Sequence, residues 1–90
     1  MTSGDDLYKV VLRPAAQRDF DGLARDVQQR IVAALGKLSV EPRGAGLKKL
    51  AGGDDLYRKR VGDYRIIFQI DDATRTVRVA IIRHRKDAYR

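Results

Sequence analysis

The chain has 90 residues, of which 43% are hydrophobic and 34% are charged, and its formal net charge is +7. This balance is typical of one globular domain spanning residues 1–90 rather than of a disordered chain, and no apolar run approaches the roughly 20 residues that cross a membrane. The absence of cysteine excludes disulfides and zinc–thiolate sites, and the single histidine argues against another metal centre. We therefore expect a cytoplasmic protein without a cofactor.

The positive charge is concentrated in one half of the chain. Residues 1–42 contain six Lys/Arg and six Asp/Glu, whereas residues 43–90 contain thirteen Lys/Arg and six Asp. Such asymmetry favours a polyanionic partner, either a nucleic acid or an acidic protein segment. A surplus that served solubility alone would not need to be concentrated.

The first half of the chain predicts one strand and two helices. Residues 7–12 are rich in β-branched and aromatic side chains and predict a strand. Pro14 suits the first turn of a helix that Gly22 weakens or ends, and a second helix is predicted from about residue 26 to residue 40, with Asp26 as its cap and Pro42 as its stop. The apolar stripes of these helices are Ala16, Phe20 and Leu23 in the first and Val27, Ile31, Leu35 and Leu38 in the second.

Residues 43–55 are predicted to be the longest irregular segment. They contain four of the eight glycines, placed around Leu47-Lys48-Lys49-Leu50. A loop of this length in a small domain is often functional. We expect Leu47 and Leu50 to hold it against the body of the protein and leave Lys48 or Lys49 facing a ligand.

Residues 56–70 have the form of a β-hairpin, with arms at 56–61 and 64–70 and a tight turn at Gly62-Asp63. Alternation in the second arm places Arg65, Ile67 and Gln69 on the face opposite to the core. A last strand is predicted at residues 76–82. The side chains predicted to face the core are Tyr64, Ile66, Phe68 and Ile70 in the hairpin, and Val77, Val79 and Ile81 form one face of the last strand.

This order predicts an α+β domain with β-α-α-β-β-β topology in two layers. A helical hairpin packs on one face of a mainly antiparallel four-stranded sheet, and the other face stays open. Arg58 and Arg60 are two residues apart, so they share a face about 6.6 Å from each other. Arg65 should lie beside them, and Arg85, just past the last strand, is expected to reach the same surface. Converging guanidiniums suit phosphate, because each offers planar, bidentate donors.

Two residues near the end of the chain could complete a catalytic site. His84 is the one side chain that titrates near neutrality without help, which makes it a candidate general base. Tyr89 is a candidate for stacking on a base and donating a hydrogen bond to a phosphate.

Several segments in a fixed order carry a family resemblance. They are YKVVLRPAAQRDF near the start, LKKLAG in the glycine-rich segment, LYRKRVGDYRIIFQI in the hairpin and RHRKDAY at the end. Over residues 7–90 the chain resembles a toxin of the RelE/ParE superfamily of bacterial type II toxin–antitoxin modules, and in particular the RelE-like mRNA interferases. The GDYRIIF segment and the tail from His84 to Tyr89 carry most of this resemblance.

The resemblance implies the fold derived above, with the first strand beside the last, and an endoribonuclease activity. RelE-type toxins enter the ribosomal A site and cleave the bound mRNA, inhibiting translation; the 2′-hydroxyl attacks the neighbouring phosphate and leaves a 2′,3′-cyclic phosphate. The candidate catalytic residues are then Arg65, Arg85, His84 and Tyr89, and the candidate RNA- or phosphate-binding residues are Arg58, Arg60, Lys48, Lys49 and Arg83.

One departure from the family pattern concerns the base. The best-known RelE pattern has lysines where this chain has Arg58 and Arg60, and an arginine does not deprotonate in proteins. The base is then expected to be His84 or a lysine of the 48–49 pair.

Two other functions compete with this interpretation. A ParE-like inhibitor of DNA gyrase would share the scaffold without nuclease activity, although the full basic set favours the RelE type. A remnant that only binds its antitoxin is the third possibility. In each case the implied partner is a cognate antitoxin, joined for the RelE type by the ribosome and mRNA, with DNA contacted only through the antitoxin and no membrane involved.

Overall fold

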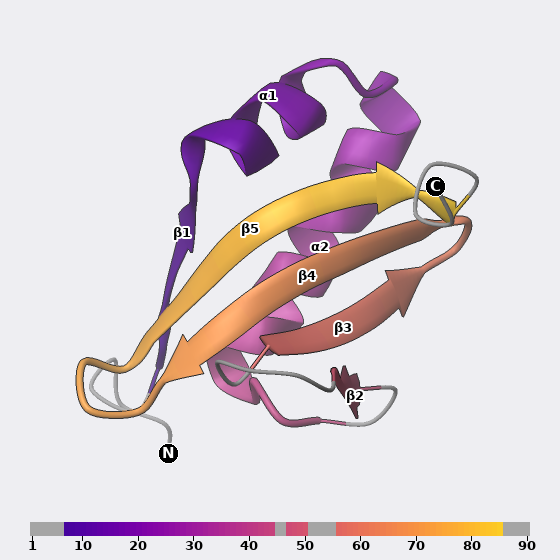
Figure 1. Cartoon of the computed structure of the whole chain (residues 1–90). Coiled ribbons are helices and arrows are strands. Elements are labelled where there is room, and N and C mark those ends of the chain that lie inside the picture. The colour runs from indigo at the N-terminus through magenta and orange to yellow at the C-terminus, as the bar shows by residue number, and fades with distance from the viewer. Residues whose placement is uncertain (1–6, 45–46, 51–55, 86–90) are drawn as a thin grey trace.

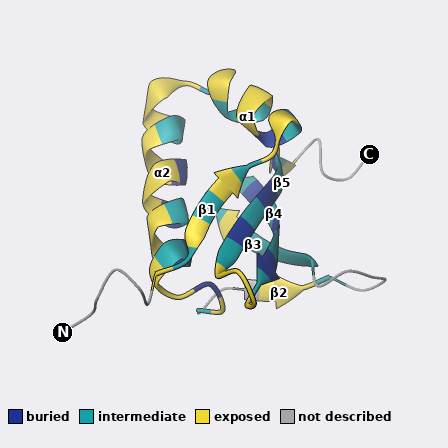
Figure 2. Cartoon of the chain, turned by 90° about the vertical axis from the view of Figure 1, so that its left-hand side faces the viewer, coloured by how far each residue is buried: buried dark blue, intermediate teal, exposed yellow. Residues whose placement is uncertain are grey.

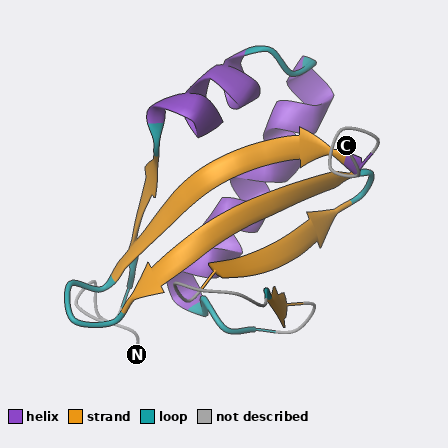
Figure 3. Cartoon of the chain, in the orientation of Figure 1, coloured by secondary structure: helices purple, strands orange, loops and turns teal. Residues whose placement is uncertain are grey.

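The computed structural model describes residues 7–44, 47–50 and 56–85. Within these ranges two helices and five strands follow each other as β1 (Lys9–Leu12), α1 (Pro14–Asp21), α2 (Arg25–Val40), β2 (Leu47–Lys49), β3 (Leu56–Val61), β4 (Tyr64–Asp71) and β5 (Thr76–His84). The sheet has the order β1-β5-β4-β3-β2; β1 runs parallel to β5, and the other neighbours are antiparallel (Figures 1 and 3). The predicted α+β class and the pairing of the first strand with the last are confirmed.

The sheet has one strand more than the four expected. Residues 47–49, predicted to be irregular, pair with β3 as the edge strand β2. This strand was not predicted, because three residues are too few for alternation to be recognised and the flanking glycines indicated a loop.

The helices cover one face of the sheet, as Figure 2 shows from the side. Ile31, Ala34 and Leu38 of α2 and Ala16 of α1 are buried against the sheet. Pro14 opens α1, where its missing N–H leaves no bond unmade, and Gly22 caps its end. The prediction that Asp26 caps α2 was wrong, because the cap position is Ala24. Asp26 lies in the first turn, where its negative charge interacts favourably with the helix dipole.

The hairpin of β3 and β4 forms as predicted. Gly62 has a φ of +58°, the left-handed conformation that the tight turn requires and that glycine adopts without a steric cost. On β4, Ile66 and Phe68 are completely buried and Ile70 nearly so, while Tyr64 packs against the rim of the core.

The alternation predicted for the last strand is broken. Ile67 pairs with Ile81 but Phe68 pairs with Val79, so Ala80 is an extra residue in β5. Val77 and Val79 share a face, as predicted, and that face is buried, but after the bulge it continues with Ile82 and not with Ile81. The prediction that Ile81 shares the face of Val77 and Val79 was wrong, because a bulge exchanges the two faces of a strand. The same exchange places Arg83, paired with Arg65, on the open face.

Candidate functional site

Three arginines form a row across the open face of the sheet. Arg65 on β4 is paired with Arg60 on β3 and with Arg83 on β5. Directly paired residues of antiparallel strands have their side chains on the same face, and like charges in these positions are destabilising. A row of three cations is therefore unfavourable for the fold by itself, which is typical of a site kept for binding an anion.

A hollow of about 190 Å³ lies at one end of this row, beside the β3–β4 turn, and is lined by Arg60, Gly62, Asp63, Tyr64, Arg65 and Arg85. Arg65 is only 7% exposed, whereas Arg60 and Arg85 are open to solvent. The backbone N–H of Arg85 donates to the carbonyl oxygen of Asp63 at 2.7 Å, which fixes the end of β5 against the hairpin turn. The hollow thus brings together cations from three segments of the chain.

Two carboxylates lie near these cations. The Nε atom of Arg85 is 3.9 Å from Oδ1 of Asp63, and Nε of Arg83 is 3.6 Å from Oδ2 of Asp19, with all four side chains at least partly in solvent. Ion pairs of this kind contribute little, about 0–1 kcal/mol. The cluster of Arg60, Arg65, Arg83 and Arg85 keeps an excess of positive charge over these two carboxylates.

The two lysines of β2 lie on opposite faces of the sheet. Lys48 pairs with Arg58, which pairs with Ile67, so Lys48 and Arg58 share the open face with the arginine row. Lys49 pairs with Tyr57, whose ring stacks on the core residue Phe68 with 6.0 Å between centroids. Of this pair of lysines, Lys48 is the one on the face of the arginine row.

His84 lies on the helix-facing side of the sheet. It pairs with Tyr64, and the two rings meet edge to face with centroids 5.1 Å apart. Because Arg65 is the next residue after Tyr64, its side chain points to the opposite face, and His84 is not among the residues that line the hollow. The structure therefore brings Arg60, Arg65 and Arg85 together around the hollow and pairs Arg83 with Arg65, whereas His84 lies on the other face of the sheet, against the lining residue Tyr64. Tyr89 lies outside the described residues.

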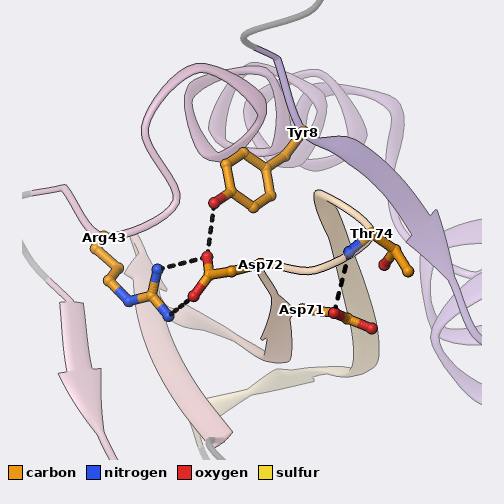
Figure 4. A network of polar contacts seen from close by, with 5 residues as sticks. All are labelled: Tyr8, Arg43, Asp71, Asp72 and Thr74. Atoms are coloured by element: carbon orange, nitrogen blue, oxygen red, sulfur yellow. Dashed lines mark hydrogen bonds and ion pairs between the residues drawn. The ribbon is translucent and has the colours of Figure 1, made fainter.

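A second polar cluster was missed from the sequence. At the β4–β5 turn, Asp72 accepts two hydrogen bonds from the guanidinium of Arg43, at 2.9 and 3.0 Å, and one from the hydroxyl of Tyr8 at 2.6 Å (Figure 4). The hydrogen bonds from Arg43, followed by that from Tyr8, lower the pKa of Asp72 to about 2, and the same bond to Asp72 raises the pKa of Tyr8. No sequence signal joins these residues, because they lie 29 and 64 positions from Asp72.

No group of His, Asp or Glu in residues 7–44, 47–50 and 56–85 is arranged to hold a metal ion. Neither helix in that part of the chain is long and apolar enough to cross a membrane.

Comparison with known proteins gives one family. The family described as the ParE toxin of the type II toxin–antitoxin system, parDE, matches residues 10–89. Toxin RelG of Mycobacterium tuberculosis is 36% identical over 87 residues, which cover 92% of this chain and 97% of the relative. Toxin RelE of the same organism is 30% identical over 89 residues, covering 98% and 92%.

Solved structures agree with the sequence comparison. The toxin–antitoxin complex RelBE2 of Mycobacterium tuberculosis matches with a TM-score of 0.77 and 31% identity, covering 87% of this chain and 98% of the other. The archaeal RelE–RelB complex of Pyrococcus horikoshii matches with a TM-score of 0.78 and 25% identity, covering 88% and 96%. The chain belongs to the RelE/ParE family of toxins of type II toxin–antitoxin systems.

Proposed function

We propose that this toxin binds mRNA in the ribosomal A site through the open face of its sheet and cleaves it. The observation that carries the proposal is a hollow that suits a phosphate and is lined by Arg60, Arg65 and Arg85, with Arg83 paired to Arg65 in the same row. Guanidiniums hold phosphate oxygens bidentately and stabilise the negative charge that grows on them during phosphoryl transfer. The repulsion among these arginines destabilises the free protein, and a phosphate of the RNA backbone would relieve it on binding.

In the proposed reaction the ribose 2′-hydroxyl attacks the adjacent phosphorus, and the bond to the 5′-oxygen of the next nucleotide breaks. The products are a 2′,3′-cyclic phosphate and a free 5′-hydroxyl, so a proton must leave the attacking oxygen and another must reach the leaving oxygen. Arg65 and Arg85 would stabilise the negative charge on the oxygens of the pentacoordinate phosphorane that forms before the 5′-oxygen leaves. They cannot exchange the protons, because a guanidinium stays charged.

Lys48 is the base that the geometry favours. It lies on the open face with Arg58, whereas His84 and Lys49 lie on the other face. Two strand spacings and two residues separate Lys48 from Arg65, which places their Cα atoms about 12 Å apart. Two long side chains over that distance can contact one nucleotide from both sides.

The proposed partners follow from the charge and from the relatives. RelBE2 and the archaeal RelE–RelB pair were solved as toxin–antitoxin complexes, and a net charge of +7 suits an acidic antitoxin segment. We infer that a cognate antitoxin covers the arginine row, that the association weakens with salt, and that any DNA is contacted through the antitoxin. The protein would act in the cytoplasm, where the ribosomes are.

Inhibition of DNA gyrase is a second candidate function, because the matching family is described as ParE. In that case the open face would bind a protein surface, and no RNA would be cleaved. Inducing the toxin and following the incorporation of labelled amino acid and thymidine separates the two functions. We expect protein synthesis to stop first; an earlier arrest of DNA synthesis would favour the gyrase target.

Variants link the arrest to the site. Arg65→Ala and Arg85→Ala should each relieve growth arrest while the circular dichroism spectrum remains that of the wild type. Arg25→Ala is the matched control, since it removes the same charge from an exposed position at the start of α2. Undiminished toxicity in both site variants would refute the proposed role of the row, and a wild-type chain without toxicity would favour a remnant that only binds its antitoxin.

A further inference from the structure

Four segments of the chain meet around Arg43 and Asp72. Arg43 follows the end of α2, Tyr8 immediately precedes β1, and both donate hydrogen bonds to the Asp72 carboxylate on the β4–β5 turn (Figure 4). The guanidinium of Arg43 also lies over the ring of Tyr57 on β3, 5.7 Å from the centroid. A bidentate pair combined with a cation–π contact holds a guanidinium in one orientation better than a single ion pair does.

The contacts of Arg43 with Asp72 and Tyr57 form a clamp, and Arg43 lies shortly before β2 in the chain. Arg43 is four residues before Leu47, where β2 begins. The ring beneath Arg43 belongs to Tyr57, the residue that pairs with Lys49 of β2. The clamp therefore joins the segment that follows α2 to β3, the strand with which β2 pairs.

The edge strand β2 needs such an anchor. It has three residues and pairs with a single neighbour, β3. A slip of one residue would turn Lys48 to the other face of the sheet, and Lys48 would no longer stand opposite Arg58. Register in a short edge strand is set weakly by its own pairing, because few bonds and few side-chain contacts specify it.

We propose that Arg43 is a positioning residue, whose clamp on Asp72 and Tyr57 fixes the register of β2 and so keeps Lys48 on the open face of the sheet. The proposal rests on the proposed RNA-binding role of that face. It assigns a function to the Tyr8–Arg43–Asp72 cluster, which lies away from the arginine row and contacts no proposed substrate.

The first test does not involve RNA. The backbone N–H of Leu50 donates to the carbonyl oxygen of Leu56 at 2.8 Å, at the end of β2. Arg43→Ala and Asp72→Asn should each speed hydrogen exchange at this amide by about threefold to tenfold, the range expected for an exposed bidentate pair. Arg25→Ala should leave the exchange rate of the Leu50 amide unchanged, and Arg43→Lys should give a rate between those of the wild type and Arg43→Ala. An unchanged rate in both Arg43→Ala and Asp72→Asn would overturn the proposal.

The second test asks which lysine faces the RNA. The probe is a short single-stranded 2′-O-methyl RNA, which the proposed reaction cannot cleave. With the clamp intact, Lys48→Ala should weaken binding about fivefold at 0.1 M salt, the effect of one phosphate contact, and Lys49→Ala should weaken it less. In the Asp72→Asn background, which loses no cation, the two lysines should become nearly equivalent.

The outcomes separate the two proposals. A preference for Lys48 that survives in the Asp72→Asn background would overturn the positioning role of Arg43. If the wild-type protein binds no RNA while Leu50 loses protection in the clamp variants, the clamp is supported and the proposed function is wrong.

Discussion

The irregularity at Ala80 makes a sharp prediction, because it decides which of two adjacent isoleucines belongs to the core. Ile82 is 2% exposed and pairs with the fully buried Ile66, whereas Ile81 is half-buried on the open face opposite Ile67. Replacing a buried isoleucine by alanine typically costs about 2–5 kcal/mol, through lost transfer free energy and the cavity left behind. Ile82→Ala should fall in this range, and Ile81→Ala should cost less than about 1.5 kcal/mol, because its side chain is already partly in water.

The assay is urea unfolding of the two variants, which share residue type and strand and so control for each other. The midpoint should fall strongly for Ile82→Ala and slightly for Ile81→Ala, with similar slopes. If Ile82→Ala leaves too little folded protein, Ile82→Val should still cost about 0.5–1.5 kcal/mol. A larger loss at Ile81 than at Ile82 would mean that alternation is unbroken. Arg83 would then face the helices, and the arginine row would lose a member.

Three further predictions concern charge and the hairpin turn. Arg60→Ala should reduce the slope of log K against log[salt] for single-stranded RNA by about 0.7, and Arg25→Ala should leave the slope unchanged; equal slopes for the two variants would argue against contact at the row. Because the folded pKa of Asp72 is about 2, below its ordinary value of 3.8, its ionisation stabilises the fold above pH 3.8, and this contribution is lost as pH falls from 3.8 towards 2. The free energy of unfolding should therefore depend less on pH in this window for Asp72→Asn than for the wild type. The same pH dependence in both proteins would argue against the hydrogen bonds from Arg43 and Tyr8 to Asp72. Gly62→Ala should cost about 1–2 kcal/mol in thermal unfolding because of its φ of +58°, and a neutral result would mean that the turn adopts another conformation.

Local patterns in the sequence predict most of this fold. The stripe of Ile31 and Leu38 identifies α2, and the alternation around Ile66 and Phe68 identifies β4, because burial imposes these periods on the side chains. The bulge at Ala80 has no such signal. Strict alternation along β5 therefore puts Ile81 on the face of Val77 and Val79, whereas the extra residue gives that place to Ile82.

The candidate site was predictable in part. Arg60 and Arg65 could be placed beside each other, because the hairpin turn fixes the register of its two arms. The positions of His84 and Arg83 could not, since both follow the bulge and a shift of one residue exchanges their faces. Asp72 was missed for a different reason: hydrogen-bonding partners far apart in sequence leave no periodic pattern.

The central claim is that the arginine row acts on mRNA in the ribosome. Sequencing the 5′ ends of cellular RNA shortly after induction tests it most directly, with Arg65→Ala as the comparison. The account predicts new ends inside translated reading frames, in phase with the codons and carrying a 5′-hydroxyl, that are absent from the variant. An RNA population without such ends, in cells that the wild-type toxin has arrested, would contradict it.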